Sequence, residues 1–137
     1  MIKEHYDAVK ALMPAGLTVY RGSVPDAPSY PYVVLWGDLG TESSGGPDGD
    51  SLRDGTDVLT FRPRVTYVGL TFDSVLIICR NVRAALNHKA PIVTGWAPSK
   101  LRQSSLMDVQ TDTDVTLAGG AHPVFAVDEF SLVSQKL

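Results

Sequence analysis

The histidines are the first side chains in this sequence to consider for metal or acid–base chemistry. His5, His88 and His122 stand far apart and lack the close pairing that zinc sites show. We interpret all three as surface histidines. His88 and Lys89 also follow a predicted helix, where a positive charge suits the negative end of the helix dipole.

The aspartates form two groups. Asp112 and Asp114, in the segment TDTD, resemble a fragment of a calcium loop, but the glycine and the distal glutamate of such loops are missing. A solvated acidic turn is the simpler interpretation. Asp48, Asp50 and Asp54 lie among glycines, so gathering them around a cation would cost much conformational entropy. We therefore predict no metal site and no cofactor.

The nucleophile candidates are also weak. Cys79 lies on an apolar helical stripe with only Arg80 and Arg83 as basic neighbours, which favours a core cysteine over a reactive thiol. A lone cysteine fits a reducing compartment. No serine occupies a Gly-x-Ser-x-Gly elbow. These patterns favour a protein that works by contact over an enzyme.

The polar insert at residues 40–56, GTESSGGPDGDSLRDGT, separates two apolar runs that read as strands. Its composition cannot bury enough apolar surface to order itself, and loops of this length inside a small domain usually have a use. We predict a long flexible loop that contacts a partner. The contact residues that we expect in it are Ser43, Ser44, Asp48, Asp50 and Arg53.

Length and charge limit the classes of protein to which this chain can belong. At 137 residues the chain fits a single domain that buries roughly two-thirds of its unfolded surface. Twelve basic residues against 15 acidic ones, without a basic block, argue against a general or sequence-specific DNA binder. This argument from net charge does not cover arginines that oligomerisation would bring together into a local ring. No long apolar segment follows the N-terminal residues, so we expect neither a signal peptide nor a membrane span.

Apolar periodicity predicts two main helices. Ile2, Tyr6, Val9 and Met13 share one helical face, and Pro14 ends that pattern. A longer helix is predicted over residues 72–87, with Thr71 as its N-cap.

Strands are predicted over residues 17–20, 30–37, 58–69, 101–110 and 124–133, and residues 90–99 read as a connection. Pro63 suggests that its strand lies at an edge or carries a bulge. A change of apolar parity suggests one extra residue near Asp128. The order of elements predicts one α+β domain over residues 1–137, with a mostly antiparallel sheet and both helices packed on one face.

Arginines and aromatic residues are the remaining contact candidates. Arg62 and Arg64, on the polar face of one strand, and Arg21 and Arg53, in adjoining loops, either pair with acidic groups of a neighbouring copy or are weak surface charges. The aromatic residues Tyr30, Tyr32 and Trp36 share one strand parity. Either the core or a subunit interface would use them, and we expect Trp36 in the core.

The order of these elements resembles that of the tail terminator and tail completion proteins of long-tailed, siphovirus-type bacteriophages. An N-terminal helix is followed by VYRGSVPDAPSYPYVVLWGD, a polar loop, and RPRVTYVGLTFDSVLIICRNVRAAL, which runs from an arginine-bearing strand into a helix. The resemblance covers most of the chain but rests on pattern, without a catalytic motif.

The resemblance implies a small α+β virion protein that closes into a hexameric ring and caps the tail tube. Such a ring ends tail polymerisation and presents the surface for head–tail joining, and DNA passes through it. The implied partners are the tail-tube protein and the neck or head completion proteins. The implied location is the head-proximal end of the tail, with assembly in the host cytoplasm. The insert matches a loop used against the tube or a neighbouring subunit, and Arg21, Arg62 and Arg64 are the predicted subunit contacts.

Two other functions stay open. The nearer alternative is a neck or head completion protein, another ring component, which would bind the portal side. The more distant one is a soluble small-molecule-binding domain or an enzyme, with Tyr30, Tyr32 and Trp36 lining a pocket.

Overall fold

The computed structural model describes residues 1–43 and 57–137. Both predicted helices are present, α1 at Ile2–Leu12 and α2 at Phe72–Leu86. Helix α1 ends where Met13 turns extended, as expected for a residue before proline. Helix α2 begins at the predicted cap, because the Thr71 side chain accepts a hydrogen bond from the Ser74 backbone N–H at 3.1 Å. Among the described residues, no helix is both long and apolar enough to cross a membrane.

The sheet is built around its last strand. The strands are β1 Val19–Arg21, β2 Tyr32–Gly37, β3 Thr41–Ser43, β4 Val58–Phe61, β5 Pro63–Gly69, β6 Trp96–Pro98, β7 Arg102–Thr111 and β8 Val124–Lys136. Strands β4 and β5 pair with one edge of β8, and β6 and β7 pair with the other. Strand β2 extends the sheet from β5, and β3 from β4. Only the β1–β2 pair is parallel, so the predicted α+β domain with a mostly antiparallel sheet is confirmed.

Strands β4 and β5 form one nearly continuous strand, as the alternation over residues 58–69 predicts. Phe61 lies opposite Leu132 and Arg64 opposite Glu129, so the register along β8 does not shift at the short break between them. The prediction for Pro63 was wrong, because β5 lies between β2 and β8 and is not bulged against β8. The irregularity lies in the strand segment beside it. Gly37 at the end of β2 pairs with Pro63, and Thr41 at the start of β3 pairs with Thr60, which leaves one extra residue between Gly37 and Thr41.

The change of apolar parity in β8 has a different cause from the bulge we predicted. The register between β5 and β8 is unbroken from Arg64–Glu129 to Gly69–Val124, and the irregularities lie in β7. Asp128 occupies a position that faces the helices, where an apolar residue would continue the pattern. It is 2% exposed, so the parity change marks a buried carboxylate and not an extra residue.

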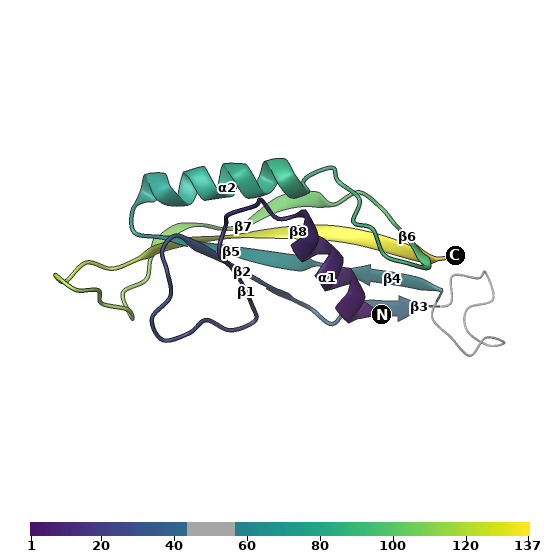
Figure 1. The fold of residues 1–137 in the computed structure, drawn as a ribbon, viewed down its shortest axis with the longest axis horizontal. Coiled ribbons are helices and arrows are strands. Elements are labelled where there is room, and N and C mark those ends of the chain that lie inside the picture. Colours follow the sequence, from purple (N-terminus) through teal and green to yellow (C-terminus); the bar gives the residue numbers. More distant parts are fainter. Residues whose placement is uncertain (44–56) are drawn as a thin grey trace.

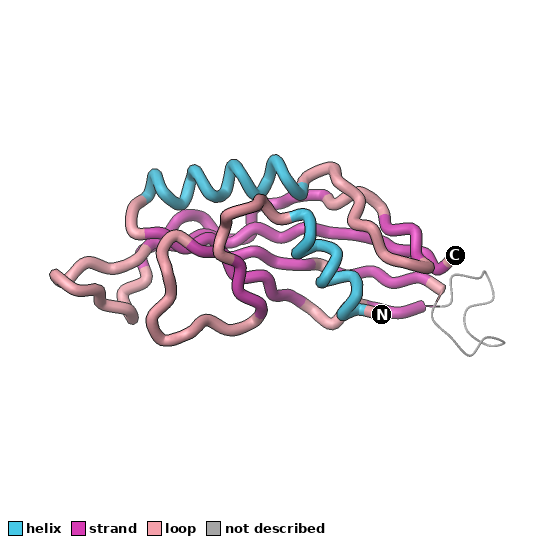
Figure 2. Tube along the Cα trace, viewed as in Figure 1, coloured by secondary structure: helices cyan, strands magenta, loops and turns pink. Residues whose placement is uncertain are grey.

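Both helices pack on the same face of the sheet, as predicted (Figures 1 and 2). The core between the helices and the sheet is formed chiefly by Val9, Val33, Leu35, Leu59, Phe61, Val65, Tyr67, Val75, Ile78, Val82, Leu86, Leu101, Phe130 and Leu132. A second, smaller cluster of Tyr32, Val34 and Val68 lies on the opposite face. The strand predicted over residues 30–37 is therefore apolar on both faces, but only one face is covered by helices.

Three regions differ from their predicted structure. Residues 41–43, predicted as the start of the loop at 40–56, form β3, which pairs with β4. Residues 96–98, predicted as part of a connection, form β6, in which Ala97 pairs with Gln135. His5, predicted at the surface, is fully buried. Its Nδ1–H donates to the Met1 carbonyl at 2.7 Å, and its Nε2 lies 2.7 Å from the Ser134 hydroxyl, which donates to it. The ring also makes edge contacts with Phe61 and Trp96, so His5 is a hydrogen-bonded core residue that joins α1 to β8.

Asp128 joins α2 to the sheet. Its carboxylate accepts hydrogen bonds from Arg83 Nε and Nη2, both at 2.7 Å, and from the Tyr67 hydroxyl at 2.7 Å. The hydrogen bond to Asp128 raises the pKa of the Arg83 guanidinium, and burial, reinforced by the same carboxylate, raises that of Tyr67. Burial also raises the pKa of the Cys79 thiol, which packs against the core as predicted. This group of residues holds the helix in place and offers no activated nucleophile.

Candidate interaction surface

The face of the sheet opposite α1 and α2, here called the open face, carries no helix among the described residues (Figures 1 and 2). Alternation along the strands decides which side chains it presents. Along residues 58–69 it presents Thr60, Arg62, Arg64 and Thr66, whereas the alternate residues Leu59, Phe61, Val65 and Tyr67 face the core. This confirms the two faces that the sequence predicts for residues 58–69. The open face is therefore a surface of mixed polar and apolar side chains that no helix of the described chain covers.

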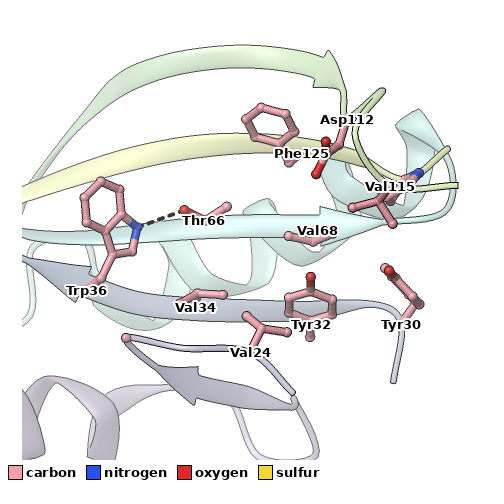
Figure 3. A pocket seen from close by; sticks show the side chains of 12 residues that line it. Val24, Tyr30, Tyr32, Val34, Trp36, Thr66, Val68, Asp112, Val115 and Phe125 are labelled. Carbon is pink, nitrogen blue, oxygen red and sulfur yellow. Dashed lines mark hydrogen bonds between the residues drawn. The ribbon is translucent and has the colours of Figure 1, made fainter. Parts of the chain in front are cut away.

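One end of the open face holds an aromatic pocket of about 350 Å³ (Figure 3). The Tyr32 ring lines it, and its centroid lies 5.3 Å from those of both Tyr20 and Tyr30. The residues that line it are Gly22, Val24, Tyr30, Tyr32, Val34, Trp36, Thr66, Val68, Asp112, Val115, Pro123 and Phe125. Burial, with smaller effects from Tyr30 and Asp112, raises the pKa of Tyr32. The structure thus brings Tyr30, Tyr32 and Trp36 to one pocket, as the small-molecule alternative requires.

Trp36 corrects the prediction that placed it in the core. Its side chain is 36% exposed and lies on the open face. The indole N–H donates to the Thr66 hydroxyl at 2.8 Å (Figure 3). The Arg64 guanidinium lies 5.2 Å from the ring centroid. Trp36 is thus held in place by its polar neighbours while much of its apolar surface stays available for contact.

The predicted subunit-contact arginines differ in their local partners. Arg64 Nε donates to Glu129 Oε2 at 3.0 Å, and Arg21 pairs with Asp7. Arg62 has no ion-pair partner within the described part of the chain, although its backbone N–H donates to Asp38. The structure does not bring these three arginines together at one point. Their role between subunits stays a prediction.

The predicted partner-contact loop is only partly described. Ser43 ends β3, is exposed, and its carbonyl accepts a hydrogen bond from the Asp57 N–H at 3.0 Å. The other predicted contact residues, Ser44, Asp48, Asp50 and Arg53, lie outside the described residues. Their contact with a partner stays a prediction.

A basic hollow of about 550 Å³ lies farther along the open face, where β4 and the start of β7 flank β8. Its lining residues are Thr60, Arg62, Ser99, Lys100, Arg102, Ser131, Leu132 and Val133. Sequence reasoning identified only Arg62 among its three cations. Lys100 and Arg102 stand in the short segment SKLR, which gives no signal of its own, and they meet Arg62 only because β4 and β7 flank the same strand.

The acidic turn after β7 has the structure that TDTD predicts. Asp112 Oδ1 accepts a hydrogen bond from the Asp114 backbone N–H at 3.1 Å, which is an Asx turn. Asp114 is exposed, while Asp112 is half-buried at the rim of the aromatic pocket. His122 is half-buried and contacts the Val115 carbonyl across the same loop, and His88 is exposed at the end of α2.

Comparisons with known proteins bear on the fold. No family model matches the chain, and no curated protein sequence matches it. Its fold is similar to that of a chain in the solved structure of the virion of a native gene transfer agent (GTA) particle, with a TM-score of 0.50 and 15% sequence identity. The alignment covers 91% of this chain and 84% of the other. The two chains share a fold over most of their lengths.

Proposed function

We propose that this chain is a structural virion protein that forms a ring on the head-proximal end of a phage tail tube. The ring ends tail polymerisation and presents the surface to which the head is joined. The observation that carries this proposal is the fold shared with a chain of a GTA virion particle over 91% of this sequence. It agrees with the order of elements that resembles tail terminator proteins.

The open face supports a function by contact. It exposes large apolar side chains beside polar ones, with Trp36 at 36% and Val133 at 43% exposure. In addition, β7 pairs only with β8 among the described strands, so a ten-residue strand edge is left without a partner strand. Such edges invite pairing unless another chain covers them. A ring of subunits would supply that cover.

A ring of identical copies fits these features because a heterologous interface repeats one pair of patches until it closes. A hexamer is the ring that the resemblance implies. In this arrangement residues 40–56 contact the tube or a neighbouring subunit, and Arg21, Arg62 and Arg64 lie between subunits. DNA passes through the opening without being read. The protein assembles in the host cytoplasm and is then part of the virion.

Two alternatives make different predictions. A neck or head completion ring would bind the portal side and would not bind the tail-tube protein. A small-molecule-binding domain is favoured by one observation, the aromatic pocket of about 350 Å³ lined by Tyr30, Tyr32 and Trp36. A ligand for that pocket would raise the melting temperature of the monomer in a saturable manner.

The proposal is tested by adding the protein to polymerising tail-tube protein of the parent phage and measuring tube lengths by electron microscopy. We expect the wild-type chain to cap tubes and shorten them. A variant in which residues 44–53 are replaced by a Gly-Ser linker of equal length should cap poorly, because the linker preserves the β3–β4 connection but removes the side chains. Tubes of unchanged length with the wild-type chain would overturn the capping proposal.

A further inference from the structure

The basic hollow has the chemistry of an anion site. Arg62, Lys100 and Arg102 are all exposed there, and among the described residues no carboxylate lines the hollow. None of these cations has an ion-pair partner in the described part of the chain. The hydroxyl groups of Thr60 and Ser131 add hydrogen-bond donors to the same space. An anionic group placed there would relieve the repulsion among the cations and accept several charge-assisted hydrogen bonds.

The acidic turn has the complementary chemistry. Asp114 is exposed and Asp112 is half-buried at the start of the loop that joins β7 to β8, and neither carboxylate has a cationic partner among the described residues. The turn is anchored at its base, since the Asp112 N–H donates to the Pro123 carbonyl at 2.8 Å, and internally by the Asx turn. A turn already held in shape loses little conformational entropy when it binds.

The hollow and the turn lie toward opposite ends of the same strand. Arg102 begins β7 and Thr111 ends it, and ten residues of strand span roughly 30 Å. Figure 1 shows the β7–β8 loop projecting from one end of the molecule, away from β6 and the C-terminus at the other. One copy therefore cannot bring its own turn to its own hollow.

We propose that the basic hollow of one copy receives the Asp112–Asp114 turn of the next copy, which makes this pair a head-to-tail contact. The inference rests on the proposed ring and names the contact that closes it. Because the two patches are different and lie at opposite ends, the contact is heterologous, as a closed ring requires. It also gives the acidic turn a function.

Nucleic acid is the main competing occupant of the hollow. A duplex is usually held by a row of cations that follows its phosphates. Here three cations gather in one hollow of a chain whose formal net charge is −3. That number suits two carboxylates better than a phosphate backbone, so the observations favour a second copy.

Two charge-reversed variants test the contact. The hollow variant carries Lys100→Glu and Arg102→Glu, and the turn variant carries Thr113→Lys and Asp114→Lys, which leaves the Asx-turn carboxylate of Asp112 in place. Each variant alone brings like charges together, so we expect self-association to weaken about tenfold or more. In an equimolar mixture each reversed hollow meets a reversed turn, and each native hollow meets a native turn. The mixture should regain the wild-type mass in sedimentation velocity, with the two variants alternating.

A matched control carries Asp73→Arg, which reverses an exposed carboxylate at the start of α2, on the covered side of the sheet. It should keep the wild-type mass. The contact is overturned if the single-type variants assemble like the wild type, or if their mixture stays dissociated. It is also overturned if a 20-base-pair DNA duplex binds the wild type, loses affinity for the hollow variant, and the assembly mass is unaffected. Tube capping by both variants would reject this contact while leaving the proposed function intact.

Discussion

Asp128 is the side chain on which the attachment of α2 to the sheet most depends. A buried carboxylate is tolerated when its hydrogen-bonding capacity is used, and here Arg83 and Tyr67 use it. Removing the carboxylate leaves the Tyr67 hydroxyl buried without its acceptor and the guanidinium without its partner.

We expect Asp128→Ala to lower the free energy of unfolding by about 3 kcal/mol, the usual cost of breaking a buried charge pair from one side. The measurement is urea denaturation followed by circular dichroism. As the control, Asp108→Ala removes an exposed carboxylate of β7 and should change stability by about 0.5 kcal/mol or less. A loss below about 1 kcal/mol for Asp128→Ala would show that the pair contributes little to stability.

At the residue scale, the sequence identifies apolar core positions better than buried polar ones. The alternation of Leu59, Phe61, Val65 and Tyr67 predicts their burial correctly, because apolar residues at every second position indicate a strand with one buried face. The burial of His5 and Asp128 depends on partners more than 40 residues away in sequence, Ser134 in one case and Arg83 in the other. Such partners leave no local pattern.

The kink between β2 and β3 is the most constrained feature at the scale of elements. Gly37 has a φ of 150°, and a Cβ atom there would lie 2.5 Å from the Tyr6 hydroxyl and 2.6 Å from the Arg62 carbonyl oxygen. The Tyr6 hydroxyl donates to the Asp38 carbonyl beside it at 2.8 Å, and burial raises the pKa of Tyr6 to about 12. The kink therefore joins α1, β2 and β5 at one point.

We expect Gly37→Ala to lower the free energy of unfolding by about 3 kcal/mol, because the clash with a backbone carbonyl adds to the strain of the φ angle. Gly16→Ala is the control. Gly16 also has a positive φ, of 81°, but nothing lies within 4 Å of its Cβ position, so about 1 kcal/mol is expected. Thermal and urea denaturation compare the two variants. Equal losses would mean that the close approach at Gly37 is relieved without cost.

Among the elements, the long periodic ones are predictable and the short ones are not. Helix α2 and its cap follow from an apolar stripe and Thr71, within a residue of the observed end. The three residues of β6 carry no period, and a proline ends that strand, so only pairing with β8 reveals it. The bulge expected in β8 was wrong for a related reason, since a buried charge and an extra residue break the apolar pattern in the same way.

At the scale of the whole molecule, the main core lies between the helices and one face of the sheet, and the proposed contacts lie on the other face. The α+β class follows from the order of elements, and the shared fold with a chain of a GTA virion particle agrees with it. The basic hollow could not be predicted, because Arg62 and Arg102 are 40 positions apart and become neighbours only across β8. Of the contact arginines predicted from sequence, Arg62 and Arg64 share the open face, whereas Arg21 pairs with Asp7 of α1.

The measurement that tests the central claim most directly is the mass of the wild-type chain in solution, by light scattering on a sizing column. It is made across protein concentration, alone and with purified tail-tube protein. We predict a ring, or a monomer that becomes a ring on the tube. A stable monomer whose mass is unchanged by tube protein would contradict the account.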